Sequence, residues 1–205
     1  ITGISLGVAG AAMQGVLRNP LVSPYTLGLS SGAACGAAIA IVLGVGLLGT
    51  GRYIIAINAF FFSLLTMAIV YGISRMKGTS VETLILAGVA MGYLFSAVIS
   101  LLKYVSGHEE LREVVFWLMG GLYTARWENV IILIPTVLIL TTIMMRYSWD
   151  LNAMSAGEEV ASSLGINVNR VRLICLTLST ILTASVIAFT GIIGFIGLVS
   201  PHVCR

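Results

Sequence analysis

The sequence has 205 residues, of which 58% are hydrophobic and only 9% are charged. Soluble domains carry about 25% charged residues, so this composition excludes a soluble enzyme or binding module and indicates an integral membrane protein. The net charge of +3 is distributed along the chain and gives no indication of a nucleic-acid partner.

Uncharged runs along the chain predict an all-α, polytopic bundle of transmembrane helices. Each run is near the ~20 residues that an α-helix needs to cross a bilayer. They lie at residues 1–17, within 26–46, within 53–74, within 83–102, within 129–145, and from 173 to about 189. Pro135 is expected to kink the fifth helix, because proline removes a backbone hydrogen-bond donor and clashes with the preceding turn.

The apolar run that begins after Arg172 is too long for one crossing and contains glycines near its end. Gly191 and Gly194 predict a break in the helix, followed by a short second helix that starts near Gly194. Irregular backbone at membrane depth must be buried in protein or line a water-filled cavity. The break therefore indicates either part of a transport path or a tight turn at the membrane surface.

Small residues recur every four positions in the first, second and fourth predicted spans. Such stripes let helix backbones approach closely, which holds helices together in lipid, where there is little hydrophobic driving force between them. We expect the following glycines to pack helices against one another: Gly3, Gly7, Gly15, Gly28, Gly32, Gly36, Gly88 and Gly92.

The segment 155–165 has the pattern of a short helix between two apolar runs. Ser155 and Glu158 have the spacing of a capping box, and Gly165 lies where a C-terminal glycine of left-handed conformation belongs. Roughly ten residues are too few to span a membrane. Two interpretations stay open: a helix that lies at the lipid headgroups, or a helix that docks a soluble partner.

Lysine and arginine residues indicate the orientation, because cytoplasmic loops carry an excess of them. Six loop cations fall on the side of the segment 155–165: Arg18, Arg75, Lys77, Arg146, Arg170 and Arg172. Four fall on the other side: Arg52, Lys103, Arg112 and Arg126. This bias predicts that the segment 155–165 is cytoplasmic. On the opposite side we expect a charged stretch at 107–113, then a re-entrant or interfacial helix in the apolar piece 114–125.

The sequence offers no enzyme chemistry and no metal site. No span centre carries Asp, Glu, Lys, Arg or His, which disfavours a proton-coupled pump. A Walker A loop is missing, so ATP hydrolysis through that fold is not expected in this chain. The cysteines, Cys35, Cys175 and Cys204, are expected to be small core residues. We therefore predict a non-enzymatic chain that itself binds no cofactor and no metal.

Three blocks of sequence, taken together, resemble one family. The first comprises Gly10-Ala-Ala-Met-Gln-Gly15, Arg18-Asn-Pro-Leu21, Pro24, Leu27-Gly28 and Ser31-Gly-Ala33. The second comprises Leu86-Ala-Gly-Val89 and Trp117-Leu-Met-Gly-Gly121. The third comprises Gly157-Glu-Glu159, Ala161, Leu164-Gly165, Gly191, Gly194-Phe-Ile-Gly-Leu198, Pro201-His202 and Arg205. In order and spacing they resemble the permease subunits of type II ABC importers, which carry iron-siderophores, haem and vitamin B12.

The resemblance covers essentially all 205 residues. Family members are longer and have ten spans. The resemblance therefore implies that residues 1–205 are one transmembrane permease domain, cut from a longer chain at both ends.

The resemblance also implies roles for three groups of residues. The segment 155–165 would dock on a separate ATP-binding subunit through Ser155, Ala156, Gly157, Glu158, Glu159, Ala161, Leu164 and Gly165. The connection 78–82 would form a cytoplasmic gate with Thr79, Ser80, Val81 and Glu82, although Glu82 departs from the hydroxyl residues expected there. A short helix at 107–116 would lie beside the pathway at the outer face, with Glu109, Glu110, Arg112 and Glu113.

The partners and the location follow from the same resemblance. It implies an ATP-binding cassette subunit that holds the ATP, an extracytoplasmic substrate-binding protein, and a second permease copy in a homodimer or a heterodimer. The location would be a prokaryotic inner membrane. The alternative is a non-ABC membrane transporter or a structural membrane subunit. The spans offer no set of ligands that could replace the hydration shell of a bare metal ion, so we expect the cargo to be an organic metal chelate.

Overall fold

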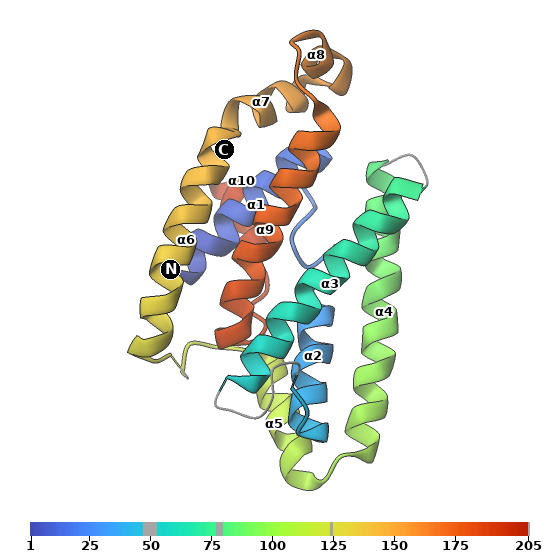
Figure 1. Ribbon diagram of the computed structural model, residues 1–205, viewed down its shortest axis with the longest axis vertical. Coiled ribbons are helices and arrows are strands. Elements are labelled where there is room, and N and C mark those ends of the chain that lie inside the picture. The colour runs from blue at the N-terminus through green and yellow to red at the C-terminus, as the bar shows by residue number, and fades with distance from the viewer. Residues whose placement is uncertain (47–52, 77–79, 124, 205) are drawn as a thin grey trace.

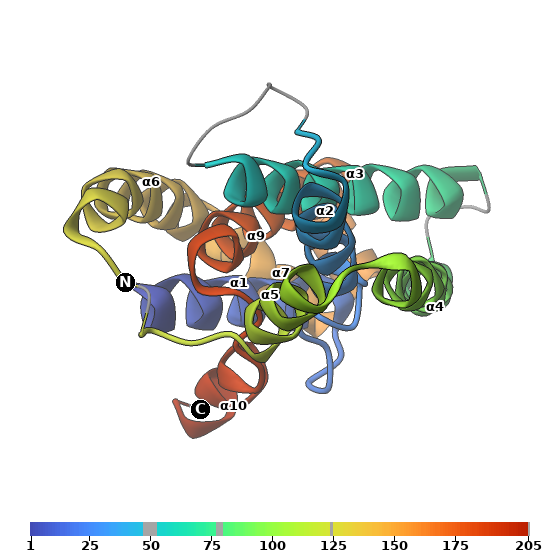
Figure 2. The same ribbon diagram turned by 90° about the horizontal axis from the view of Figure 1, so that it is seen from below.

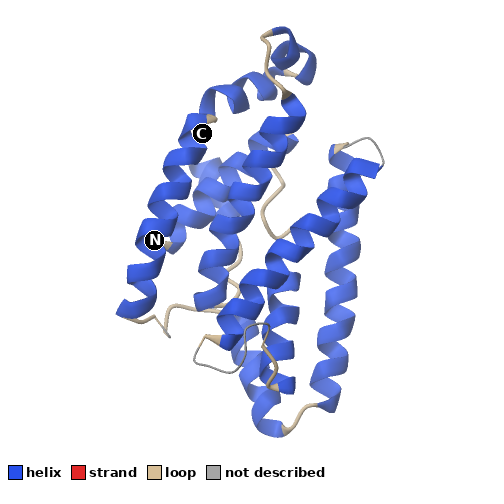
Figure 3. Cartoon of the chain, in the orientation of Figure 1, coloured by secondary structure: helices blue, strands red, loops and turns tan. Residues whose placement is uncertain are grey.

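The computed structural model describes residues 1–46, 53–76, 80–123 and 125–204, and in these ranges the chain forms ten α-helices and no strand (Figures 1 and 3). The helices are α1 (Thr2–Leu17), α2 (Leu29–Leu43), α3 (Ile54–Met76), α4 (Val81–Val105), α5 (His108–Met119), α6 (Trp127–Arg146), α7 (Ser148–Ala156), α8 (Glu158–Ser163), α9 (Val168–Thr190) and α10 (Ile196–Val203). The expectation of an all-α bundle is confirmed.

Each predicted span corresponds to one helix: α1, α2, α3, α4, α6 and α9. By length and composition, α3, α4, α6 and α9 can cross a membrane. The other two are equally apolar but contain only 16 and 15 residues. Helix α6 continues as one helix through Pro135. The predicted break after the sixth span is confirmed, because α9 ends at Thr190 and α10 begins at Ile196.

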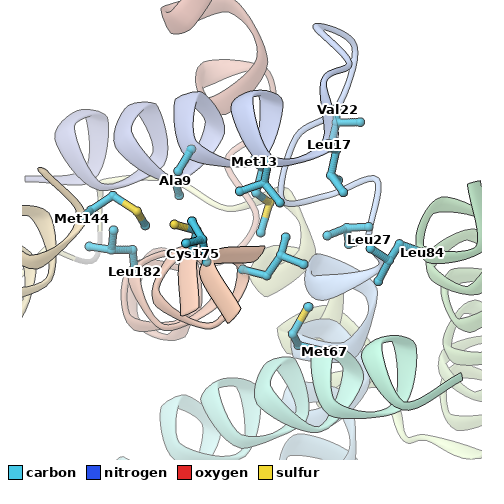
Figure 4. Packing of buried hydrophobic residues seen from close by; sticks show 14 of the residues in the cluster. Ala9, Met13, Leu17, Val22, Leu27, Met67, Leu84, Met144, Cys175 and Leu182 are labelled. Carbon is cyan, nitrogen blue, oxygen red and sulfur yellow. The ribbon is translucent and has the colours of Figure 1, made fainter. Parts of the chain in front are cut away.

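The main hydrophobic core lies around α1 and α9 (Figure 4). Met13 of α1 and Cys175 and Leu182 of α9 are fully buried in it. Met67 of α3 and Met144 of α6 belong to the same cluster. Helix α9 is the most buried of the four candidate spans, because α1, α3 and α6 all pack against it (Figure 2). Helices α1 and α9 therefore form a fixed centre for the segments at the ends of the bundle.

The predicted packing glycines fall into three groups. A Cβ atom would come closer than 3.0 Å to an atom of another segment at Gly28, Gly32, Gly36 and Gly88. It would make ordinary contacts, at 3.5 to 3.8 Å, at Gly7, Gly15 and Gly92. Gly3 requires a correction, because a Cβ there would meet nothing within 4 Å among the described residues. Its spacing matches the stripe, but that position lies beyond the part of α1 that other segments cover.

Gly10 is the glycine of α1 at which another backbone comes nearest, and the predicted stripe does not include it. A Cβ atom at Gly10 would overlap the backbone carbonyl of Gly197 in α10. At Gly7, one turn earlier, a Cβ would lie 3.5 Å from Ser200 of the same helix. The α1–α10 crossing therefore depends on Gly10, which lies against the Gly197 backbone, while a Cβ at Gly197 would lie 3.1 Å from the Leu6 carbonyl oxygen.

Candidate functional site

The segment predicted to dock a partner is made of two helices, and this corrects the capping-box prediction. Ser155 belongs to α7, where its hydroxyl donates to the Leu151 carbonyl oxygen at 2.9 Å. Gly157, at φ 137° and ψ 149°, separates α7 from α8, so Glu158 is the first residue of α8. The prediction failed because α7 follows α6 directly at Tyr147. The chain is already helical when it reaches Ser155, whose hydroxyl therefore bonds backwards within its own helix.

The C-terminal end of α8 has the predicted glycine cap. Gly165 has φ 82°, and its N–H donates to the Ser162 carbonyl oxygen at 3.0 Å. The Ile166 N–H donates to the Ala161 carbonyl oxygen at 3.1 Å. These two bonds are those of a Schellman motif, and the accompanying contact is made by the buried Ala161 and the partly buried Ile166. The cap turns the chain from α8 into α9.

Glu158 joins α8 to the two central helices. Its Oε1 accepts from Nη2 of Arg172 at 2.6 Å and from Nη2 of Arg18 at 3.0 Å. Arg172 lies in the first turns of α9, with only 3% of its side chain exposed, and its Nη1 also donates to Oδ1 of Asn169 at 3.3 Å. Arg18 follows the last residue of α1. A charge-assisted bond to a buried guanidinium is stronger than an exposed ion pair, so Glu158 fixes α8 to α9, and its more exposed pair with Arg18 adds a weaker link to the end of α1.

Sequence reasoning did not find this ion-pair cluster. The sequence marks Arg18 and Arg172 as loop cations, Arg18 also as part of a family block, and Glu158 as half of a capping box and a docking residue, but no pattern links the three. Arg18 and Arg172 are 154 positions apart along the chain. The available signal was the placement of both arginines at the ends of spans on the side of α8.

The cluster lines a polar cleft of about 800 Å³ at the same end of the bundle. One wall is the start of α4, with Ser80, Val81 and Glu82 of the predicted gate. The other wall is the docking segment, with Ala156, Gly157, Glu158, Glu159 and Val160, and the cleft is completed by Arg18, Asn169 and Arg172. The structure thus brings the predicted gate and the predicted docking segment to one cleft. Thr79 lies outside the described residues.

Ser80 organises the gate wall. Its hydroxyl oxygen accepts from the Thr83 backbone N–H at 3.2 Å and so caps the N-terminus of α4. Glu82 lies in the first turn of α4, where a negative charge is favoured by the helix dipole. Its side chain is exposed to the cleft.

Two predicted docking residues lie at the surface and away from the cleft. Leu164 is 68% exposed, and Gly165 is also exposed. Val160, which borders the cleft, is 48% exposed. The segment therefore exposes two apolar side chains, Val160 at the cleft beside the acidic Glu159 and Leu164 away from the cleft.

Helix α5 lies at the end of the bundle opposite to α8 (Figure 1). Of its predicted site residues, Glu109, Arg112 and Glu113 are exposed and Glu110 is half-buried. Arg112 Nη1 lies 3.6 Å from Glu109 Oε2, and its guanidinium stands 5.8 Å from the centre of the Phe116 ring. These charges form a solvated face, while Val114 is buried against α2 and α4.

The apolar piece after this face differs from the prediction. Residues 114–119 continue α5 and do not begin a re-entrant or interfacial helix of their own. Gly120, at φ 58°, ends α5, and the Gly121 N–H donates to the Thr190 carbonyl oxygen at 2.8 Å. A Cβ atom at Gly191 would overlap the Trp117 carbonyl oxygen. Glycines therefore let the ends of α5 and α9 meet backbone to backbone.

The break between α9 and α10 is held by a side chain from the loop before α2. The Tyr25 hydroxyl donates to the carbonyl oxygen of Ile193. This bond satisfies one of the backbone groups that leave the helical pattern between Thr190 and Ile196. In the part of the chain that the structure describes, no group of three or more His, Cys, Asp or Glu residues could hold a metal ion.

The whole chain, residues 1–205, matches the FecCD transport family. It is 40% identical to the cobalamin import system permease protein BtuC of Halobacterium salinarum, over 99% of this chain and 54% of that protein. It is 38% identical to the molybdate import system permease protein MolB of Haemophilus influenzae, over 99% of this chain and 59% of that protein. The chain thus spans less than two thirds of the length of these relatives.

A solved structure of a metal-chelate type ABC transporter in an inward-facing conformation has the same fold. The two superpose with a TM-score of 0.90 at 36% identity, over 100% of this chain and 65% of that one. The chain has four helices long and apolar enough to cross a membrane, and it matches a family of transport proteins. It is therefore a multi-pass membrane protein. By sequence over its full length and by fold, the chain belongs to the FecCD transport family.

Proposed function

We propose that the chain is the permease subunit of an ATP-driven importer for metal chelates of the iron-siderophore, haem or cobalamin type. The observation that carries the proposal is the attachment of α8 to α1 and α9 through Glu158, Arg18 and Arg172. A helix that only lay at the headgroups would need no buried arginine from a transmembrane helix. A helix fixed to two transmembrane helices can pass a partner's movement to the bundle.

ATP hydrolysis belongs, in this proposal, to a separate ATP-binding cassette subunit that docks on α8. Val160 and Leu164 offer it an apolar contact, and Glu159 offers a charge at the edge. A substrate-binding protein would approach the opposite, extracytoplasmic end, where α5 presents its charged face. A second permease copy would complete the pathway in a prokaryotic inner membrane. The packing at Gly28, Gly32, Gly36 and Gly88 uses only some faces of the bundle and leaves others for that copy.

The cargo class rests on the relatives and on the composition of the spans. Cobalamin is named for one relative and metal chelates for the structural neighbour. Such cargo carries its own metal ligands, so a wall of small, hydroxyl and apolar residues can pass it. Molybdate is the second candidate, because another relative is named for it. An oxyanion is less suited to spans without lysine or arginine at their centres, since a charge in the membrane needs a partner.

Site-directed crosslinking tests the docking of an ATPase on α8. In the full-length permease, expressed with the ATP-binding subunit encoded beside it, a photo-crosslinker at Ser162→Cys is expected to capture that subunit, because Ser162 is exposed on α8. The matched control is Glu110→Cys on α5, at the opposite end, which is expected to give no such product. Equal yields at both positions, or no ATPase product at Ser162→Cys, would return α8 to the role of a headgroup helix.

A further inference from the structure

Arg18 has a backbone conformation that is unfavourable for its residue type. Its φ and ψ are 47° and 37°, and Phe195 is the other non-glycine residue with positive φ among the described residues. The backbone closes α1, since the Arg18 N–H donates to the Gly15 carbonyl oxygen at 3.4 Å and the Asn19 N–H to that of Gln14 at 3.2 Å. Glycine would close a helix in this way with less strain. What arginine adds at this position is the guanidinium.

The guanidinium of Arg18 lies in a cleft that two carboxylates border, Glu158 on one wall and Glu82 on the other. Glu158 on the α8 side holds it at 3.0 Å, and 40% of the Arg18 side chain remains exposed. Glu158 already has a shorter and more buried bond to Arg172, at 2.6 Å. On the α4 side, Glu82 borders the same cleft, where its carboxylate interacts first with its own backbone N–H and the Ser80 side chain and more weakly with the charge of Arg18. Arg172 can therefore keep Glu158 in place while Arg18 interacts with Glu82.

We propose that Arg18 and Glu82 form an electrostatic latch that closes the cleft between α8 and the start of α4. This rests on the proposed function, because the partner on α8 would drive the closure. Narrowing the cleft brings Glu82 towards Arg18, which stays attached to α8 through Glu158. The attraction grows as the two charges approach and as water leaves the cleft. Glu82 is thus a positioning residue that links the docking helix to the entrance of α4.

Thiol crosslinking across the cleft measures its closure. Val81 on the α4 wall and Val160 on the α8 wall both border the cleft and are each replaced by cysteine. Cys204, predicted as a core residue, is exposed in the structure, so Cys204→Ser removes its thiol. The full-length transporter is assayed with its ATP-binding subunit, with and without ATP, at about 50 mM and about 500 mM salt. Salt screens exposed charges, so we expect the crosslinked fraction to fall at high salt. Glu82→Gln is expected to lower this fraction about two- to five-fold at low salt, the effect of an exposed ion pair, and to remove its salt dependence.

Two variants separate the latch from a general effect on the fold. Glu82→Asp keeps the charge and is expected to retain the salt dependence. Asp150→Asn removes a carboxylate of α7 that borders a different cleft, which Arg170 also lines. This variant is expected to give the same crosslinked fraction and salt dependence as the wild type. Salt dependence in Glu82→Gln equal to that of the wild type, with or without ATP, overturns the latch. If crosslinking of the wild type depends on salt but does not change with ATP and the ATP-binding subunit, the latch is supported and the proposed function is contradicted.

Discussion

Replacing Glu158 with lysine is expected to abolish transport while leaving the permease in the membrane. The substitution places a third cation beside Arg18 and Arg172, whose side chains now share one carboxylate oxygen. Removing one partner of a buried ion pair costs about 3–5 kcal/mol. Glu158 is 38% exposed, so we expect roughly 2–3 kcal/mol for the attachment of α8. A loss of this size shifts the balance between attached and detached α8 by roughly 30- to 140-fold, because each 1.4 kcal/mol changes a population about tenfold.

Uptake and membrane insertion are measured together for this variant and for two others. Glu158→Gln keeps an oxygen that can accept from Arg172 but loses the charge, so its activity is expected to be intermediate. Glu159→Lys makes the same charge change on the neighbouring exposed residue, outside the ion pairs of Glu158, and is expected to reduce transport less. Equal losses in Glu158→Lys and Glu159→Lys would show that surface charge, and not the attachment of α8, limits transport.

Among glycine-to-alanine substitutions in α1, Gly10→Ala is expected to lower the stability of the fold most. The added Cβ would overlap the backbone of Gly197, and neither backbone can rotate away as a side chain can. Overpacking of this kind costs about 1–3 kcal/mol. That is a fall of roughly 2–12 °C in melting temperature for a chain of this size. Thermal unfolding of the purified protein in detergent measures it.

The matched control for Gly10→Ala is Gly3→Ala in the same helix. There the new Cβ meets nothing within 4 Å in the described ranges, and alanine is the better helix former by about 1 kcal/mol. We expect the melting temperature of Gly3→Ala to stay level or rise slightly. Two variants that melt alike would contradict the close crossing of α1 and α10.

The sequence alone was sufficient for the six predicted spans and insufficient for the places where they cross. The length of an uncharged run identifies a span, because an α-helix needs about 20 apolar residues to cross a bilayer. The helices predicted in this way are α1, α2, α3, α4, α6 and α9. A small-residue stripe identifies a helix face but not the point where another helix crosses it. Gly3 matches the stripe without a contact, while Gly10 makes the close crossing one position away from it.

The candidate site shows the same division between local and long-range information. The cap at Gly165 is local, since it depends on residues within one turn, and it was predicted correctly. The capping box at Ser155 failed because the preceding helix α7, which no pattern had indicated, already includes that residue. The bonds of Glu158 to Arg18 and Arg172 join distant parts of the chain, and no local spacing encodes them.

Uptake into proteoliposomes tests the central claim most directly. The full-length permease is reconstituted with its ATP-binding subunit and binding protein, and radiolabelled metal is supplied free, as siderophore, haem or corrinoid complexes, or as molybdate. We predict saturable uptake of at least one chelate that requires ATP, and none of the free divalent ion. ATP-dependent uptake of the free ion alone, or of molybdate alone, would contradict a metal-chelate permease.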